Sequence, residues 1–202
     1  MTRITVFDYG AGNLHSLVKA LAAPGVEVLV ETDPVAALDT DALVLPGVGA
    51  FGAATDRLAP GRRAMAAALE GGLPCLGICL GMQLLFARSE EGSGLGLGVI
   101  PGRVTRLLAP RVPHIGWNAV ESATDPLLVV APLDVAYYAH SYVCRPTDTA
   151  TVTAWTEASG DRFPAVVRWR RTLGVQFHPE KSSSPGVRFV QAFVHACVGG
   201  IT

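Results

Sequence analysis

The sequence lacks an excess of charge of either sign. Its 202 residues contain 16 Lys and Arg against 17 Asp and Glu, which gives a formal net charge of −1. Proteins that bind nucleic acid through its phosphates need a surplus of basic side chains. The densest basic cluster, 168–171, lies between two apolar runs, so we expect it to form a solvent-exposed hairpin turn. Nucleic acid is therefore not an expected partner.

Long apolar runs are also missing. No stretch reaches the ~18 consecutive apolar residues that a membrane helix requires. The first residues are typical of a strand and not of a charged and then apolar secretion signal. We therefore expect a cytoplasmic protein with no membrane partner. Because 50% of the residues are nevertheless hydrophobic, a chain of this length can bury one core, and we expect a single domain over residues 1–202.

Cysteine is scarce, and its spacing excludes two classes of site. The sequence contains four cysteines, namely Cys75, Cys79, Cys144 and Cys197. They form neither a CxxC pair nor a zinc-like spacing with histidine. We therefore expect reduced thiols, without a disulfide framework and without a metal site.

The first half of the chain alternates between strand and helix signals. Short apolar runs predict strands at 4–7, 26–30, 42–45 and 74–78. Between and after them, helix-like stretches occur at 14–22, at 62–70 and directly after Cys79. Strands that are almost continuously apolar are typical of a parallel sheet with helices on both faces.

The second half carries shorter strand signals separated by turns. They lie at 127–130, 136–138, 151–155, 165–169 and 173–177. We expect antiparallel strands that extend the same sheet, closed by a helix from about 186 to 197. The predicted fold class is α/β: a single three-layer, flavodoxin-like domain with a mixed, mostly parallel central sheet flanked by helices.

One stretch, Gly77-Ile78-Cys79-Leu80-Gly81, has the pattern glycine, any residue, nucleophile, any residue, glycine. It lies between an apolar strand and a helix. In so tight a turn a Cβ at either glycine would clash, and the central side chain projects from the carboxyl edge of the sheet. Cys79 is therefore a candidate nucleophile, although a cysteine considered alone is more often a small core residue.

The partners that such a nucleophile needs occur in the stretch Phe177-His178-Pro179-Glu180. A thiolate requires an imidazole to take and return a proton, and the imidazole requires a third group to fix its ring. Because Pro179 ends the strand, Glu180 can turn back toward His178. Taken alone, this stretch would be an ordinary polar turn.

Backbone donors for an oxyanion are the remaining requirement of acyl transfer. The glycine-flanked segment 46–49, with sequence PGVG, follows a strand at the same edge and can present N–H groups there. The amide of Leu80, directly after the candidate nucleophile, can be another donor. PGVG by itself would be no more than a turn.

Together these stretches resemble the class I, triad-type glutamine amidotransferases, which carry motifs like PGVGAF, GICLGMQ and FHPE in this order. The stretches DYGAGN, PHIGWN, HSYV and FHPEKS narrow the resemblance to the glutaminase subunits of imidazole glycerol phosphate synthases. The resemblance covers residues 4 to about 197.

The resemblance implies a role for each matching residue. Cys79 would be the nucleophile, His178 the general base and acid, and Glu180 the residue that orients His178. The oxyanion hole would consist of the amides of Val48 and Leu80, the former after a backbone flip. The glutamine substrate would contact Gly49, Gln83, Ser141 and Tyr142. The interface with a partner would include Asn13, Trp117, Tyr138 and Lys181.

The same resemblance implies how the product is used. Ammonia released from glutamine would pass to a cyclase subunit, which is a (β/α)₈ barrel, within a heterodimer that makes imidazole glycerol phosphate and an aminoimidazole carboxamide ribotide for histidine biosynthesis. No metal and no organic cofactor is implied.

Other interpretations stay open. Another cysteine hydrolase of this fold, such as a peptidase, would share the elbow and a histidine but would not need PGVG or Gln83. A non-catalytic relative is disfavoured by the full set of Cys79, His178 and Glu180. Among glutaminases, the subunit of pyridoxal phosphate synthase is the alternative, and the DYGAGN and PHIGWN stretches argue against it.

Overall fold

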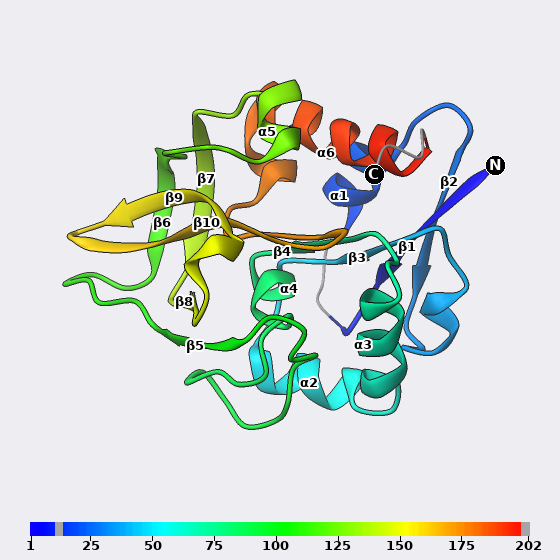
Figure 1. The fold of residues 1–202 in the computed structure, drawn as a ribbon, viewed down its shortest axis with the longest axis horizontal. Coiled ribbons are helices and arrows are strands. Elements are labelled where there is room, and N and C mark those ends of the chain that lie inside the picture. The colour runs from blue at the N-terminus through cyan, green and yellow to red at the C-terminus, as the bar shows by residue number, and fades with distance from the viewer. Residues whose placement is uncertain (11–13, 199–202) are drawn as a thin grey trace.

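A seven-stranded sheet forms the centre of the protein, for which the computed structural model describes residues 1–10 and 14–198. Its strands are β1 (Thr2–Phe7), β2 (Val26–Glu31), β3 (Ala42–Leu45), β4 (Cys75–Ile78), β9 (Val152–Ala158), β10 (Asp161–Trp169) and β11 (Thr172–Val175). They follow the order β2-β1-β3-β4-β11-β10-β9 (Figure 1). The first five in this order are parallel, and β10 and β9 continue the sheet by antiparallel pairing.

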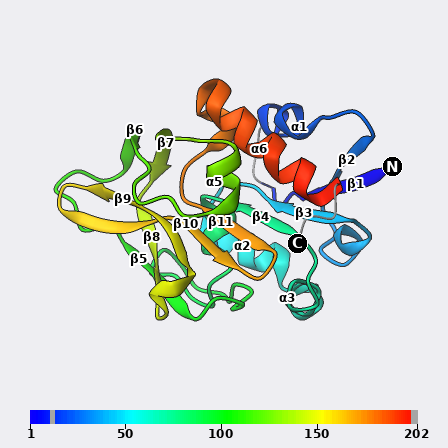
Figure 2. The same cartoon turned by 45° about the horizontal axis from the view of Figure 1, so that its top comes forward.

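Helices cover both faces of this sheet. One face carries α1 (His15–Leu21), α5 (Pro126–Val130) and α6 (Ser183–Val198), and the other carries α2 (Phe51–Leu58), α3 (Arg62–Glu70) and α4 (Leu80–Gln83) (Figure 1). Figure 2 shows α1 and α6 packed side by side. Each helical layer packs on its own cluster of buried apolar side chains. The predicted three-layer α/β fold is therefore confirmed.

The apolar sequences of the parallel strands explain why these strands lie between the two layers of helices. Every residue of β3 and β4 is buried, as are the last four residues of β1. A strand that is covered on both faces gains from apolar side chains at every position and not only at alternate ones. The strands predicted from the four apolar runs of the first half are all present.

The second half differs from the prediction in how its strands pair. β9 and β10 extend the central sheet as expected. The other strands form two separate two-stranded sheets: β5 (Gly102–Arg106) pairs with β8 (Tyr142–Pro146), and β6 (His114–Ala119) pairs with β7 (Val135–His140). Figure 1 shows these strands gathered at one end of the molecule, beyond the parallel strands.

The strand predicted at 127–130 is wrong, because these residues lie in α5. Pro126 occupies the start of the helix, and the carboxylate of Asp125 caps it by accepting from the backbone N–H of Leu127 at 3.0 Å. An apolar run of four residues does not distinguish a strand from a buried helical turn, whereas the preceding Asp-Pro pair is a helix-start signal.

The basic cluster at 168–171 forms the β10–β11 hairpin turn, as predicted. Trp169 pairs with Thr172, and Arg170 has a positive φ of 53° between them. Arg168 is not freely solvated, however. Its guanidinium binds the buried carboxylate of Asp125 through two contacts of 2.7 and 2.8 Å. One arginine of the cluster therefore joins β10 to the start of α5.

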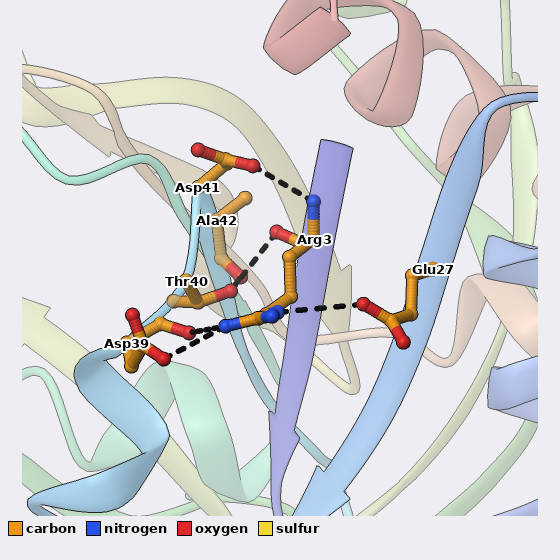
Figure 3. A network of polar contacts seen from close by, with 6 residues as sticks. All are labelled: Arg3, Glu27, Asp39, Thr40, Asp41 and Ala42. Carbon is orange, nitrogen blue, oxygen red and sulfur yellow. Dashed lines mark hydrogen bonds and ion pairs between the residues drawn. The ribbon is translucent and has the colours of Figure 1, made fainter. Parts of the chain in front are cut away.

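A second polar network lies at the amino ends of the parallel strands. Arg3 of β1 contacts Glu27 of β2 at 3.4 Å and Asp39 at 2.7 Å, and its backbone N–H donates to Asp41 (Figure 3). The side chains of Arg3, Glu27 and Asp39 are 39%, 45% and 89% exposed. The described residues also contain three short 3₁₀ helices: η1 (Ala36–Leu38), η2 (Thr149–Thr151) and η3 (Pro179–Lys181). Every helix of the described part is too short or too polar to pass through a lipid bilayer.

Candidate active site

Cys79 occupies a sharp turn between β4 and α4. Its backbone has φ 47° and ψ −102°, a conformation that residues with a Cβ rarely adopt. A Cβ on Gly77 would lie 2.7 Å from the carbonyl oxygen of Gly81, and one on Gly81 would lie 2.0 Å from that of Leu45. Both glycines are thus required by the close approach of backbone segments, as the sequence predicted. α4 is only four residues long, so the turn itself, more than the helix, presents Cys79.

His178 and Glu180 form a buried pair beside this turn. The Nδ1 of His178 lies 2.8 Å from the Oε1 of Glu180, and their side chains are 2% and 8% exposed. Pro179 begins the η3 helix, whose single turn brings Glu180 back onto the imidazole. The backbone N–H of His178 donates to the carbonyl of Tyr137, which fixes the loop to β7. The structure thus brings together two of the predicted triad residues in the expected way.

The electrostatics of His178 connect it to Cys79. Burial lowers the pKa of the imidazole, but interactions with the Cys79 side chain and with Glu180 outweigh burial and raise it to about 10. The protonated imidazole is therefore stabilised by its two neighbours, the sulfur of Cys79 and the carboxyl group of Glu180. This is the charge arrangement that a thiolate nucleophile with an imidazolium partner requires.

A cavity of about 260 Å³ opens onto the sulfur. All four residues predicted to contact glutamine line it, namely Gly49, Gln83, Ser141 and Tyr142. The side-chain amide of Gln83 donates to the backbone carbonyl of Tyr142 at 3.0 Å, which joins the end of α4 to β8 across the cavity. The cavity thus has Cys79 and polar groups from α4 and β8 in its wall.

The PGVG segment lies against the imidazole. A Cβ on Gly47 would be 2.8 Å from the Cε1 of His178, so only glycine fits there. Gly47 and Gly49 line the cavity with Cys79, as does Leu80. Val48 lines a different cavity of about 180 Å³, together with Glu180 and Lys181. Glycines flank Val48 on both sides, and Gly49 has a φ of 112°. Because glycine accepts a wide range of backbone angles, the peptide group of Val48 can reorient at low cost.

A family model for class-I glutamine amidotransferases matches residues 5–197. The chain belongs to the class-I glutamine amidotransferase family. It is 44% identical to the imidazole glycerol phosphate synthase subunit HisH of Halobacterium salinarum, over 96% of this chain and 93% of that protein. It is 47% identical to the HisH subunit of Symbiobacterium thermophilum, over 94% of this chain and 92% of that protein.

A solved structure supports the same fold. A protein from Thermoplasma acidophilum, described as part of a GMP synthase, superposes with a TM-score of 0.72 at 20% sequence identity, and the match covers 99% of this chain and 96% of that one. At so low an identity the likeness concerns the fold alone. The fold of the amidotransferase is therefore shared beyond the HisH subunits.

One predicted interface residue of the amidotransferase needs correction. Tyr138 is completely buried, with its ring against Phe177 and Phe163, so a partner cannot contact it in this conformation. Successive residues of a strand face opposite sides. It is therefore the neighbouring Tyr137 that lies beside Trp117, with ring centroids 6.0 Å apart.

The other interface predictions have different outcomes. Trp117 is 54% exposed on β6, and Lys181 is exposed at the end of η3. Both are thus accessible to a partner. Asn13 lies outside the described residues.

Four polar residues of the amidotransferase site were missed by the sequence analysis. Glu91 lines the cavity beside Cys79 and accepts from the N–H of Phe51 at 2.9 Å. The hydroxyl of Tyr9 donates to the carbonyl of Pro46, at the start of PGVG. Ser182 donates to the carbonyl of His178 at 2.7 Å and accepts from the N–H of Tyr137 at 2.9 Å. The fourth residue, Gln176, contacts the sulfur of Cys79.

The sequence features that could have predicted these four residues differ in strength. Ser182 lies inside the FHPEKS stretch and Tyr9 inside the DYGAGN stretch, so these motifs could have identified both as candidate site residues. Gln176 precedes His178 by two residues, but it lies beyond the end of β11, so strand alternation does not predict the direction of its side chain. Glu91 lies in a turn after α4, and no local pattern connects it to Cys79.

His140 also lines the cavity, but it is not suited to proton transfer. Burial is the main cause that lowers its pKa to about 3, and the neighbouring His114, 3.2 Å away between Nδ1 and Nε2, adds to the effect. The imidazole is therefore neutral at physiological pH. Among the residues that the structure describes, no three His, Cys, Asp or Glu side chains converge as a metal site.

Proposed function

We propose that this glutamine amidotransferase is the glutaminase subunit of an imidazole glycerol phosphate synthase, with residues 1–202 acting as one amidotransferase domain. In this role it hydrolyses glutamine to glutamate and ammonia. The observation that carries the proposal is the arrangement of Cys79 at the base of a cavity, on a backbone turn of positive φ, beside the buried His178–Glu180 pair. The HisH names of its relatives give the pathway.

The first half of the reaction forms a thioester. The sulfur of Cys79 attacks the side-chain amide carbon of glutamine, and the C–S bond forms as the carbonyl electrons move to oxygen. The backbone N–H groups of Leu80 and Val48 stabilise this oxyanion. We propose that the peptide of Val48 turns first, because Val48 lines the neighbouring cavity while Gly47 and Gly49 line the one that contains Cys79. When the C–N bond breaks, Nε2 of His178 gives its proton to the departing nitrogen, and ammonia leaves.

The second half consumes the thioester. His178, now neutral, takes a proton from water, and the resulting hydroxide attacks the acyl carbon. The C–S bond breaks, glutamate forms, and Cys79 leaves as the thiolate beside a protonated imidazole. Glu180 holds Nδ1 of His178 throughout, so that Nε2 always faces the reacting atoms. No electron transfer and no metal or organic cofactor enters this scheme.

The cavity supplies groups for the amino-acid end of glutamine. Gly49, Gln83, Ser141 and Tyr142 offer backbone and amide contacts around it. Glu91 adds a carboxylate on the same wall. A carboxylate fits the α-ammonium group of free glutamine, whereas a glutamine residue within a peptide lacks that charge. This feature favours a glutaminase over a peptidase.

A cyclase subunit is the partner that we propose, in a heterodimer. Ammonia released into water would be protonated and diluted, so it must be delivered to an acceptor site. An apolar face beside the cavity is formed by Ile115 and Trp117 of β6, which are 62% and 54% exposed, and by Val135 of β7, which is 48% exposed. We place the partner on this face, with Tyr137 in place of Tyr138, and with Lys181 and Asn13 at its margin. The four free cysteines fit a reducing compartment such as the cytoplasm.

The need to reorient Val48 suggests that basal activity is low. The test is glutamate formation by the purified chain, measured alone and in the presence of both the cyclase partner and its phosphoribulosyl substrate. We expect stimulation by the partner, and loss of activity in both conditions for Cys79→Ala. Cys197→Ala, which changes a cysteine of α6 far along the chain from the site, is the matched control and should behave as the unmodified protein.

The outcomes separate the alternatives. Activity of Cys79→Ala equal to that of the control would disprove the nucleophile assignment. Glutaminase activity that the cyclase does not stimulate would disprove the pathway assignment, and stimulation by the synthase subunit of the pyridoxal phosphate pathway would replace it.

A further inference from the structure

Gln176 is a completely buried polar residue that directly follows β11. Its backbone N–H donates to the carbonyl of Ala165 at 2.9 Å, at the point where β10 is irregular between Pro164 and Val166. The Nε2 of Gln176 lies 3.6 Å from the Sγ of Cys79, so the side-chain amide is directed at the sulfur.

The groups around the sulfur define what this contact can do. His178 approaches from the loop after β11, and the carbonyl oxygen of Ala139 lies 3.8 Å away on β7. Two further titratable groups, Tyr9 after β1 and Cys144 on β8, are near enough to interact electrostatically with Cys79. Burial raises the pKa of both groups, so both are neutral. Gln176 therefore supplies an uncharged N–H donor beside a sulfur that His178 must keep ionised.

We propose that Gln176 is a positioning residue for glutamine hydrolysis, whose amide N–H binds the sulfur of Cys79, favours its ionised form and holds it against His178. This inference rests on the proposed function, since it assigns a role within the same reaction. Hydrogen bonds to charged groups are stronger than those to neutral ones, so an N–H donor stabilises a thiolate more than a thiol.

The other half of the amide supports this role. Within the described residues, the Oε1 of Gln176 has no hydrogen-bond partner. A buried acceptor without a partner costs free energy, and an apolar side chain of similar shape would avoid that cost. The contact between Nε2 and sulfur is thus the feature of this position that an apolar residue cannot reproduce.

The contact between Gln176 and the sulfur of Cys79 affects two stages of the reaction. The sulfur is anionic before it attacks glutamine and again when the thioester breaks, and it is neutral in between. A donor to the anion therefore raises the fraction of thiolate available for attack and assists the leaving thiolate. Gln176 does not line the cavity that would hold glutamine. Its loss should accordingly lower kcat and leave KM nearly unchanged.

The test replaces the side-chain amide of Gln176 and measures the reactivity of the Cys79 sulfur directly. For Gln176→Leu, the rate of Cys79 alkylation by iodoacetamide is measured against pH, with the modified peptide quantified by mass spectrometry. We expect the alkylation profile to move to higher pH by about one unit, and kcat for glutamate formation to fall about tenfold. Gln176→Glu, which places a carboxylate against the sulfur, should move the profile further in the same direction.

Thr172→Val is the matched control. Thr172 is completely buried at the start of β11, the strand that Gln176 follows, and its Oγ1 also has no partner among the described residues. If burial of a polar group were all that mattered, both substitutions would behave alike. We expect Thr172→Val to leave the alkylation profile and kcat unchanged.

Two results would overturn the inference: an alkylation profile of Gln176→Leu equal to that of the unmodified protein, or an equal shift in Thr172→Val. Should Gln176→Leu fail to fold, Gln176→Met, with its unbranched chain, is judged by the same criteria. Alkylation does not require glutamine turnover, so this arm tests Gln176 even in a protein without glutaminase activity. Absence of that activity would count against the proposed function alone.

Discussion

The two edges of the central sheet use charged side chains in opposite ways. At the carboxyl ends of the strands, His178 and Glu180 are almost completely buried and are 2.8 Å apart. At the amino ends, Arg3, Glu27 and Asp39 form a network that remains largely in contact with solvent (Figure 3). In both places opposite charges meet at hydrogen-bond distance, so distance alone does not distinguish them.

Burial is what separates the two edges. Coulomb energy between charges is weak in water and much larger where water is excluded, and burial also makes an unpaired charge expensive. The carboxyl edge therefore fixes one protonation state and one ring orientation at His178. The amino edge gains little stability from its pairs, because solvent competes for the same groups. We expect substitutions at the first edge to change chemistry, and those at the second to change stability slightly.

Glu180→Gln should give the largest effect. The substitution keeps the size of the side chain but removes the charge that orients and stabilises the imidazolium of His178. By analogy with other triads, we expect glutaminase activity to fall by about 10³-fold, or about 4 kcal/mol in the activation free energy. Steady-state kinetics with the cyclase partner at saturation measure this loss, and urea unfolding checks that the protein remains folded.

Glu27→Gln makes the same chemical change at the amino edge and is the control for Glu180→Gln. Because Glu27 is 45% exposed, it should change neither activity nor stability by much. If both variants lost activity equally, the contrast between the two edges would be wrong.

The ion pair of Asp125 and Arg168 gives an intermediate case. It joins α5 to β10 close to the β10–β11 turn, and the carboxylate is completely buried while the guanidinium is 28% exposed. Asp125→Ala removes the cap of α5 and leaves Arg168 without its partner. We expect a loss of about 3 kcal/mol in the free energy of unfolding, measured by urea denaturation, with unchanged activity in the folded fraction.

The double variant Asp125→Leu with Arg168→Met sharpens this prediction. It removes both charges together, so it should regain part of the stability lost in Asp125→Ala. A double variant less stable than Asp125→Ala would mean that the pair stabilises the fold by itself, and not mainly by avoiding an unpaired buried charge.

The sequence allowed much of the carboxyl edge to be predicted, because its geometry depends on local features. Gly77 is required by a backbone contact with the nearby Gly81, and Pro179 forces the turn that returns Glu180 to His178. Gly81 is required by the backbone of Leu45 on the neighbouring strand β3, a contact that its GxCxG pattern already implies. The parallel strands were predictable for a similar reason, since burial on both faces leaves a continuous apolar run. Local steric rules of this kind are visible in a single sequence.

What the sequence did not reveal depends on contacts between distant segments. Gln176 reaches Cys79, and Glu91 reaches the cavity, only through the packing of separate elements. The proposed interface residue is Tyr137 and not Tyr138 because of the strand register, which pairs Trp117 with Tyr137 and Gly116 with Tyr138. This register cannot be predicted from the sequence of β7 alone. The helix α2 was missed because no side chain caps its N-terminus, so the sequence carries no helix-start signal there.

Arg3→Ala should have the smallest effect, although Arg3 takes part in more side-chain contacts than His178 does with Glu180. Its partners on β2 and before β3 are exposed, and the backbone bond from its N–H to Asp41 survives the substitution. We expect the free energy of unfolding to fall by less than about 1 kcal/mol, and this difference to shrink in about 1 M salt, where the Debye length is about 3 Å. Urea denaturation at low and high salt measures both quantities, and glutaminase activity should not change. A larger loss that salt leaves intact would show that the network acts by packing β1 against its neighbours, because screening removes the attraction between charges but not contact between the carbon atoms of the side chain.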